Sequence, residues 1–469
     1  MNEFSSVPAA AQLRLASRSM GVKLLVVCGL AMLLAIPAFL VGALVEDRTH
    51  RATDVINEIS NHVGGAQTFL GPTLAVPYTI PAESASQPSR HGVYLVFPAR
   101  GTALVRTSTQ ERRRSLFKVP VFEAELKMDA DFDLTGVPSA LPPGASLDWS
   151  RSEIIVGVTD PRGALADAIL TFNGKNSTMV PAQIAQSLSL SSEQSPSQRL
   201  VLFGAKIDSK IGPSALFSVS SSLHFSGAQR IAMLAYGKTT HLSVQGEWPS
   251  PGFDGGFLPV SRTVSDHGFQ AEWSVPFIAR GVRADGPSDT ITGLDGTALG
   301  ISFIEVADPY QSVNRSLKYV PLFLGLLFLS YFVFEVTTGK RVHPAQYILV
   351  GIAQIIFYLL LLSLAERIGF DLGFLLAGSA TVGLLAANAG WIFKSRAQGF
   401  KALVIFGALY SLIYLLLRLE DNALLIGAIA SFMAVAATMY FTRRIDWYSQ
   451  FAGSVHAASQ SAARDSIWK

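Results

Sequence analysis

Six long apolar runs constrain the fold of this chain more than any other feature of the sequence. They lie at residues 24–45, 319–338, 345–365, 372–393, 402–417 and 423–441. Apart from Glu335 they contain no Asp, Glu, Lys or Arg. A helix rises about 1.5 Å per residue, so about 20 residues cross a hydrocarbon core of about 30 Å. The sequence therefore predicts six transmembrane helices, one before and five after residues 46–318, which contain no comparable run.

The composition agrees with a membrane protein that carries a large soluble part. Of the 469 residues, 49% are hydrophobic and 15% are charged, against roughly 25% charged in soluble domains. The single cysteine, Cys28, excludes an intramolecular disulfide and a metal site built from several cysteines. The net charge of +3 is too small for a general nucleic-acid binder, so no nucleic-acid partner is expected.

The first apolar run has two interpretations. Three basic residues, Arg14, Arg18 and Lys23, precede it, and small residues lie near its end, as in a cleaved signal peptide. The run is longer than the roughly 7–15 residues of a signal-peptide core. An uncleaved transmembrane anchor is therefore the preferred prediction.

The basic residues of the short loops predict the orientation in the membrane. Ten lie on the side of the N-terminal residues 1–23 and the tail, residues 442–469: Arg14, Arg18, Lys23, Lys340, Arg341, Lys394, Arg396, Lys401, Arg443 and Arg444. The opposite short loops hold Arg367 and Arg418. The positive-inside rule therefore predicts that both termini are cytoplasmic and that residues 46–318 are extracytoplasmic.

The periodicity of the apolar residues changes within residues 46–318. From Ala52 to Val63 they recur at helical spacing and are followed by two glycines, which predicts an amphipathic stalk that continues the first helix. From Phe122 to Leu134 apolar and polar residues alternate, as in a half-buried antiparallel strand. Residues 217–225 and 269–275 alternate in the same way. This region is predicted to be mainly β and sandwich-like.

Two segments of this region, residues 121–162 and 217–256, share a loose order of elements. Each has an alternating strand, turns and a strand that ends in tryptophan, followed by Pro and Gly. This order is compatible with an internal duplication, so one large sandwich and two packed ones both remain open. Residues 186–198, rich in Ser, Gln and Pro, are predicted to form a linker or long loop between the halves.

The sequence contains no recognisable catalytic motif. It has no G-x-S-x-G elbow, no Walker loop and no G-x-G-x-x-G after a strand. No two of the eight histidines have the i, i+4 spacing of a helical metal site. His224 and His241 could approach each other across a strand pair, although histidines on the solvated face of a sheet explain them more simply. We therefore expect no enzyme activity, no cofactor and no metal.

The polar residues at membrane depth are the candidate functional residues. Glu335 lies near the cytoplasmic end of the second run, where it either reaches water and pairs with Lys340 or Arg341, or is a buried carboxylate that gates, binds or relays protons. In the second case its partners would be His343, Gln346 or Gln354. Asn388 is predicted to make a contact between helices. The complete candidate set is Glu335, His343, Gln346, Glu366, Glu420 and Asp421.

Distinctive short segments are distributed along almost the whole chain. They are QTFLGPTLAVP (67–77), GVTDPRG (157–163), WPSPGF (248–253), GFQAEW (268–273), RSLKY (315–319), FE (334–335), HPAQY (343–347), LLLLSLAERIGF (359–370), LED (419–421), ALL (423–425) and RIDWY (444–448). In this order they resemble the CreD family, also called the cell envelope integrity proteins. The resemblance implies a Gram-negative inner-membrane protein with a periplasmic domain. It also implies control by the Cre two-component system and links to envelope integrity, colicin tolerance and the β-lactam response. It brings no catalytic residues.

Three functions are compatible with these patterns. The first is a non-catalytic envelope-maintenance protein, whose partners are the lipid bilayer and an unidentified envelope protein or cell-wall component that contacts the β domain. The second is a transporter or channel that uses Glu335. The third is a stress-sensing regulatory protein, although its cytoplasmic parts leave no room for a signalling domain. The sequence does not decide the oligomeric state.

Overall fold

The computed structural model describes residues 20–82, 89–114, 117–192, 195–207, 211–303, 309–338, 340, 342–418 and 423–443. The chain divides into two compact units, which are described separately. One unit comprises Met1–Arg51 and Ala307–Lys469, and the other comprises Ala52–Val306.

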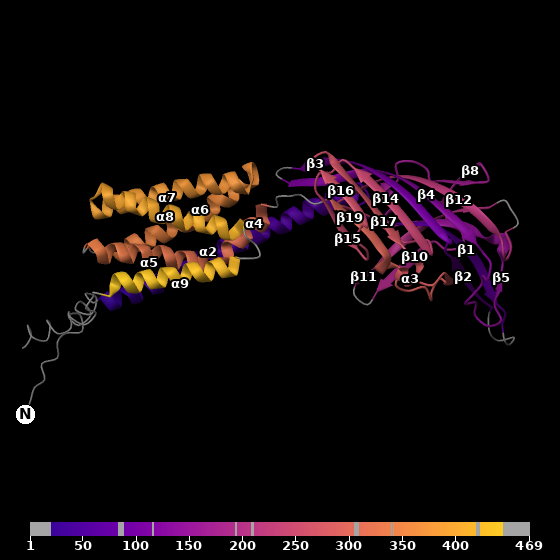
Figure 1. Ribbon diagram of the computed structural model, residues 1–469, viewed down its shortest axis with the longest axis horizontal. Helices are drawn as coiled ribbons and strands as arrows, with labels where there is room; N and C mark the ends of the chain where they lie inside the picture. The colour runs from indigo at the N-terminus through magenta and orange to yellow at the C-terminus, as the bar shows by residue number, and fades with distance from the viewer. Residues whose placement is uncertain are drawn as a thin grey trace, which may run out of the picture. The chain divides into compact units, whose positions relative to one another are not determined.

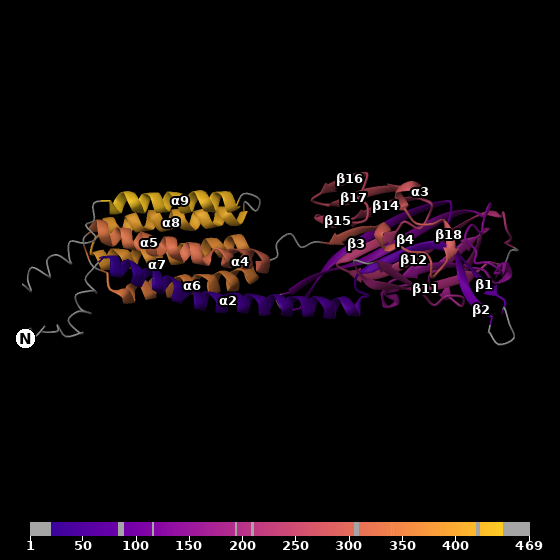
Figure 2. The ribbon, with the colours of Figure 1, turned by 90° about the horizontal axis from the view of Figure 1, so that it is seen from below.

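The first unit is helical. Its elements are the first part of α2 (Met20–His62), α4 (Pro309–Lys318), α5 (Val320–Thr338), α6 (Pro344–Ile368), α7 (Phe370–Phe393), α8 (Arg396–Arg418) and α9 (Ala423–Thr442). Figures 1 and 2 show α5 to α9 lying side by side. Within the described residues, α2, α5, α6, α7 and α8 are long and apolar enough to cross a membrane. The described apolar part of α9, Leu425–Tyr440, is shorter. The predicted membrane fold of one N-terminal helix and a C-terminal group of helices is therefore confirmed.

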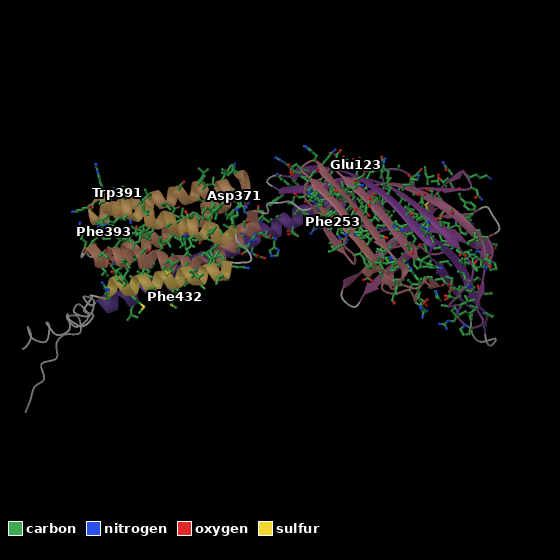
Figure 3. The ribbon with its side chains drawn as sticks, in the orientation of Figure 1. Glu123, Phe253, Asp371, Trp391, Phe393 and Phe432 are labelled. Carbon is green, nitrogen blue, oxygen red and sulfur yellow. The ribbon has the colours of Figure 1, made fainter. Side chains whose placement is uncertain are left out.

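Both the surface and the interior of this unit are apolar. Large side chains such as Met32, Leu375 and Phe432 are exposed, as expected for helices whose solvent is lipid. Phe432 is labelled on α9 in Figure 3. Small residues allow close packing inside: a Cβ on Gly373 of α7 would lie 2.9 Å from the backbone nitrogen of Ala365 on α6. Gly373, which has no side chain, therefore lets α7 pack closely against α6.

The second unit contains two β-sheets. The 11-stranded sheet comprises β1 (Gln67–Ile80), β2 (Arg90–Val96), β5 (Ser146–Leu147), β6 (Glu153–Val158), β9 (Val180–Pro181), β10 (Ser187–Ser192), β11 (Ser195–Lys206), β13 (Arg230–Leu234), β15 (Pro251–Gly255), β18 (Asp285–Pro287) and β19 (Ala298–Phe303). The 8-stranded sheet comprises β3 (Arg100–Arg114), β4 (Phe117–Asp133), β7 (Ile169–Phe172), β8 (Lys175–Thr178), β12 (Leu216–Ala228), β14 (Thr239–Gly246), β16 (Ser261–Ser265) and β17 (Gly268–Val275). The described residues of this unit also form four short helical turns: η1 (Trp149–Arg151), η2 (Pro161–Gly163), α3 (Phe277–Arg280) and η3 (Asp295–Thr297).

The alternating segments form strands as predicted. Along β4 every second side chain from Phe122 to Phe132 is buried, and the polar side chains between them are exposed. β12 and β17, which contain the other two alternating segments, also bury alternate apolar side chains. The inward side chains of both sheets belong to one large hydrophobic core. The sheets therefore pack face to face as one sandwich.

The two segments compared as possible repeats are intermixed in this sandwich. β4 from the first segment pairs along its length with β12 from the second. In the other sheet, β6 and β13 lie on opposite sides of β1, with which β13 pairs in parallel. The first segment holds β4, β5 and β6, whereas the second holds β12 to β15. This difference in element order does not support the duplication.

The prediction that residues 186–198 form a linker or long loop is wrong. β10 and β11 pair as an antiparallel hairpin across this segment. Leu188 and Leu190 of β10 are buried in the core, as are Leu200 and Leu202 of β11. The alternation of Ser and Leu is thus a strand pattern, which the high content of polar residues obscured.

The predicted stalk is the last part of α2, which runs without a break to His62. Ile56 and Ile59 pack against a small buried cluster formed by Val63 together with Val119 and Val121 of β4 and Ala228. Gly64 and Gly65 then take positive φ angles of 93° and 61°, which end the helix. The stalk is therefore packed against the sandwich.

The unit boundary defined by contacts lies at Val306, ahead of the predicted domain end at residue 318. α4 follows this boundary, and the hydroxyl of Tyr310 donates a hydrogen bond to Glu366 of α6 at 3.0 Å. This contact assigns α4 to the helical unit.

Candidate functional site in the helical unit

Glu335 lies near the end of α5 and is 2% exposed. Its Oε1 accepts a hydrogen bond from the backbone nitrogen of Val342 at 3.1 Å, and its Oε2 accepts one from the Tyr347 hydroxyl at 3.2 Å. Val342 lies in the connection between α5 and α6, and Tyr347 lies in the first turn of α6. The carboxylate is thus buried and joins two consecutive helices, and its partner Tyr347 was not among those expected from the sequence.

Lys340, one of the partners considered for Glu335, has another contact. Its Nζ donates a hydrogen bond to the carbonyl oxygen of Phe393, the last residue of α7. A cation at the carboxyl end of a helix is favourable because the helix dipole is negative there. Lys340 therefore ties the α5–α6 connection to the end of α7.

His343 and Gln346 lie at the start of α6. His343 is the exposed N-cap, and its Nδ1 accepts a hydrogen bond from the Ala345 nitrogen at 3.2 Å, while Pro344 occupies the first helical position. The side-chain oxygen of Gln346 is buried and has no hydrogen-bond partner among the described residues. His343 thus has a clear capping role, and Gln346 supplies a buried acceptor.

Further buried polar groups follow Tyr347 along α6. The Tyr410 hydroxyl of α8 donates to Oε1 of Gln354 at 2.6 Å. The Nε2 of Gln354 and the Tyr358 hydroxyl are buried and have no partner within the part of the chain that the structure describes. Residues 347, 354 and 358 share one helix face at i, i+7 and i+11. α6 therefore presents a polar line to its neighbours.

A second polar contact joins α5 and α7. The Nδ2 of Asn388 donates to the Tyr331 hydroxyl at 3.4 Å, and this hydroxyl donates to the Leu385 carbonyl at 3.1 Å. The rings of Tyr331 and Tyr347 lie 6.3 Å apart. Asn388 therefore makes the predicted contact between helices.

Of the remaining candidates, the described part of the chain includes Glu366, near the end of α6, and Asp371 lies close by at the start of α7. Glu366 accepts the bond from Tyr310 described above. Asp371, labelled in Figure 3, accepts hydrogen bonds from Arg418 and, at 3.1 Å, from the Tyr414 hydroxyl. Glu420 and Asp421 lie outside the described residues. The structure therefore places Glu335 and Glu366 in separate contacts, at opposite ends of the helices.

The tyrosines are the polar residues of this site that sequence reasoning missed. Tyr331, Tyr347, Tyr358 and Tyr410 are all buried. The sequence does contain a pattern that indicates these tyrosines, because Tyr347, Gln354 and Tyr358 have helical spacing within one apolar run. Tyrosine escaped notice because it counts as apolar in composition while its hydroxyl requires a partner when buried.

The structure does not bring His224 and His241 together. His224 lies on β12 and His241 on β14, and β3 and β4 separate these strands in the 8-stranded sheet. Among the described residues, no three His, Cys, Asp or Glu side chains are grouped so that they could hold a metal ion.

The chain is similar to known inner membrane proteins over almost its whole length. Residues 19–448 match the family described as "Inner membrane protein CreD". The inner membrane protein CreD of Escherichia coli (strain K12) is 29% identical over 458 residues, which cover 94% of this chain and 97% of that relative. The similarity therefore includes the β sandwich and the helices alike. Since the family match covers far more than half of its residues, this chain belongs to the CreD family of inner membrane proteins.

Proposed function

We propose that this protein supports the integrity of the bacterial cell envelope without catalysing a reaction. In this proposal the helices hold the β sandwich in the periplasm, where it contacts another envelope protein or a cell-wall component. The observation that carries the proposal is the joining, in one inner membrane protein, of a group of apolar helices to a large two-sheet sandwich. Because the sequence resembles envelope integrity proteins, we extend the proposal to a role in the β-lactam response and to control by a two-component system.

The outward face of the 8-stranded sheet is the surface we assign to this contact. Along β4 it carries Glu123, Glu125, Lys127, Asp129, Asp131 and Asp133, all exposed. The neighbouring β12 places His224 or a serine opposite each of these residues except Asp133, which faces the exposed Leu216. Such a broad polar face suits a hydrated, polar partner better than lipid.

Photocrosslinking tests this assignment. A photoreactive residue is placed at Glu123 or Glu125, and at Met32 or Phe432 as controls on the exposed apolar surface of the helices. We expect a defined envelope protein or cell-wall fragment to be captured from the sheet positions alone. Identical capture from both sets, or lipid alone from both, would contradict the proposal.

Transport is a second candidate, and the burial of Glu335 favours it. A carboxylate 2% exposed inside a membrane protein is costly unless it is functional or well hydrogen-bonded. If Glu335 carries a proton or ion, Glu335→Gln should abolish the envelope phenotype at an unchanged protein level. If Glu335 only joins α5 to α6, the glutamine of Glu335→Gln replaces one accepting carboxylate oxygen with an NH₂ donor. The fold then loses a hydrogen bond, so the protein level should fall. Glu366→Gln, at the other end of α6, is the matched control.

A further inference from the structure

A groove lies at the turn between α7 and α8. Its volume is about 610 Å³, and it is lined by residues from the end of α7, the turn and the first two turns of α8. Figure 3 shows Trp391 and Phe393 at this end of α7 and Asp371 at the opposite end. The groove therefore lies at the level where a membrane helix meets the polar headgroups.

Glycines form the floor of the groove. A Cβ on Gly399 of α8 would lie 3.3 Å from the Cα of Gly390 on α7 and 3.2 Å from the carbonyl oxygen of Ala386. The two helices thus approach closely at positions that have no side chains. The groove above these glycines is open to the surroundings of the helices.

Two aromatic side chains stand beside this floor. Trp391 on α7 is 71% exposed and Phe400 on α8 is 67% exposed, and both line the groove together with Leu403. An exposed tryptophan at the end of a membrane helix is typical of the interface between lipid and water. The apolar part of the groove therefore suits an acyl chain.

The polar rim of the groove is cationic. Lys394, the C-cap of α7 with a φ of 47°, and Arg396, which begins α8, are both exposed and line the groove together with Ser395. The lining includes no carboxylate. Two cations beside an apolar slot complement an amphiphile with a negatively charged head.

We propose that this groove binds one anionic diacyl phospholipid. The phosphate lies between Lys394 and Arg396, and an acyl chain lies along Trp391, Phe400 and Leu403. The two cations favour a headgroup with net negative charge over a zwitterionic one. This site is independent of the envelope function proposed above and of the role of Glu335.

Native mass spectrometry of the full chain in detergent tests the proposal. Phosphatidylglycerol and phosphatidylethanolamine with identical acyl chains are added, and the retained lipid is measured. We expect a preference for phosphatidylglycerol that falls roughly tenfold or more in the double variant Lys394→Gln with Arg396→Gln. Lys401→Gln removes an exposed cation that does not line the groove and should keep the preference. An unchanged preference in the double variant, or an equal loss in Lys401→Gln, would overturn the proposal.

Two further measurements leave Lys394 and Arg396 unchanged. Phosphatidylglycerol with brominated acyl chains should quench the fluorescence of the wild type more than that of Trp391→Phe, because Trp391 lines the groove. Inorganic phosphate at millimolar concentration should not displace the lipid. Equal quenching of the two proteins, or displacement by free phosphate, would show that no acyl chain occupies this groove.

Discussion

Tyr236 shows at the scale of single residues how the two sheets are fixed to each other. Its side chain is completely buried, and its hydroxyl donates to the carbonyls of Thr102 on β3 and Asp129 on β4. Burial raises its pKa far above the ordinary value, so the hydroxyl stays a donor at every physiological pH. Gly71 and Gly101 leave room for the ring, since a Cβ on either would lie within 2.6 Å of it.

Gly71→Ala should therefore destabilise the sandwich. The new methyl group would displace the Tyr236 ring and weaken both hydroxyl bonds, at a cost of about 2 kcal/mol. We expect a lower apparent melting temperature of the full chain, measured by intrinsic fluorescence in detergent. Gly296→Ala is the control, because a Cβ there meets nothing within 4 Å. An equal effect of the two variants would contradict this account of Gly71.

Arg230, Asp254 and Ser302 connect three neighbouring strands of the 11-stranded sheet. Arg230 on β13 donates two hydrogen bonds to Oδ1 of Asp254 on β15, at 2.8 and 2.7 Å, and Ser302 on the intervening β19 also donates to Asp254. Burial raises the pKa of Asp254, but the bonds from Arg230 and Ser302 and the charge of Arg230 outweigh it. The pKa of Asp254 is therefore below its ordinary value of 3.8.

This lowered pKa predicts the pH dependence of one substitution. An acid with a lowered folded pKa stabilises the fold above about pH 4 and loses that contribution as the pH falls through the lowered value. Arg230→Met should thus reduce the melting temperature at pH 7, and the difference from wild type should shrink below pH 4. Arg262→Met, which removes a cation that lies over the Phe253 ring, should show no such pH dependence. A difference that is constant with pH would contradict the prediction.

At the scale of elements, the segments that carry the family resemblance meet in space. Gln67 of the first quoted segment donates to the carbonyl oxygen of Asp160 in the second, at 2.9 Å. A Cβ on Gly163 would lie 2.4 Å from the carbonyl oxygen of Ser226 on β12. In the helical unit, Glu335 meets Tyr347. These residue pairs hold neighbouring elements together, so the quoted segments contribute to the packing of the fold.

The end of α2 is an element whose packing can be tested. Ile59→Asp should detach residues 52–62 from the sandwich, because a carboxylate would replace an apolar contact with the cluster of Val119 and Val121. The cost is about 1–3 kcal/mol. Hydrogen exchange of the full chain should show faster exchange in residues 52–65. Asn57→Asp introduces the same carboxylate at an exposed position and should leave exchange unchanged; an equal increase in both would refute this packing.

At the scale of the whole molecule, the orientation in the membrane is the prediction with the widest consequence. In a Cys28→Ser background, Lys175→Cys places a thiol at the β7–β8 turn and Ala397→Cys places one near the start of α8, both at exposed positions. An impermeant maleimide added to spheroplasts should label the first cysteine directly. It should label the second only after the membrane is broken, because the basic loops are expected inside. The opposite labelling would contradict the periplasmic location of the sandwich and, with it, the proposed function.

The membrane helices, the large β region between them and the strands with strict alternation such as β4 can be predicted from the sequence. These features depend on local periodicity and on the length needed to cross a bilayer, which each segment carries alone. Three features became evident from the fold alone: the two sheets form one sandwich, β10 pairs with β11, and Glu335 meets Tyr347. Strand order and the partners of a buried carboxylate depend on contacts between residues distant in sequence, and no local pattern specifies which of several similar strands or tyrosines will be adjacent.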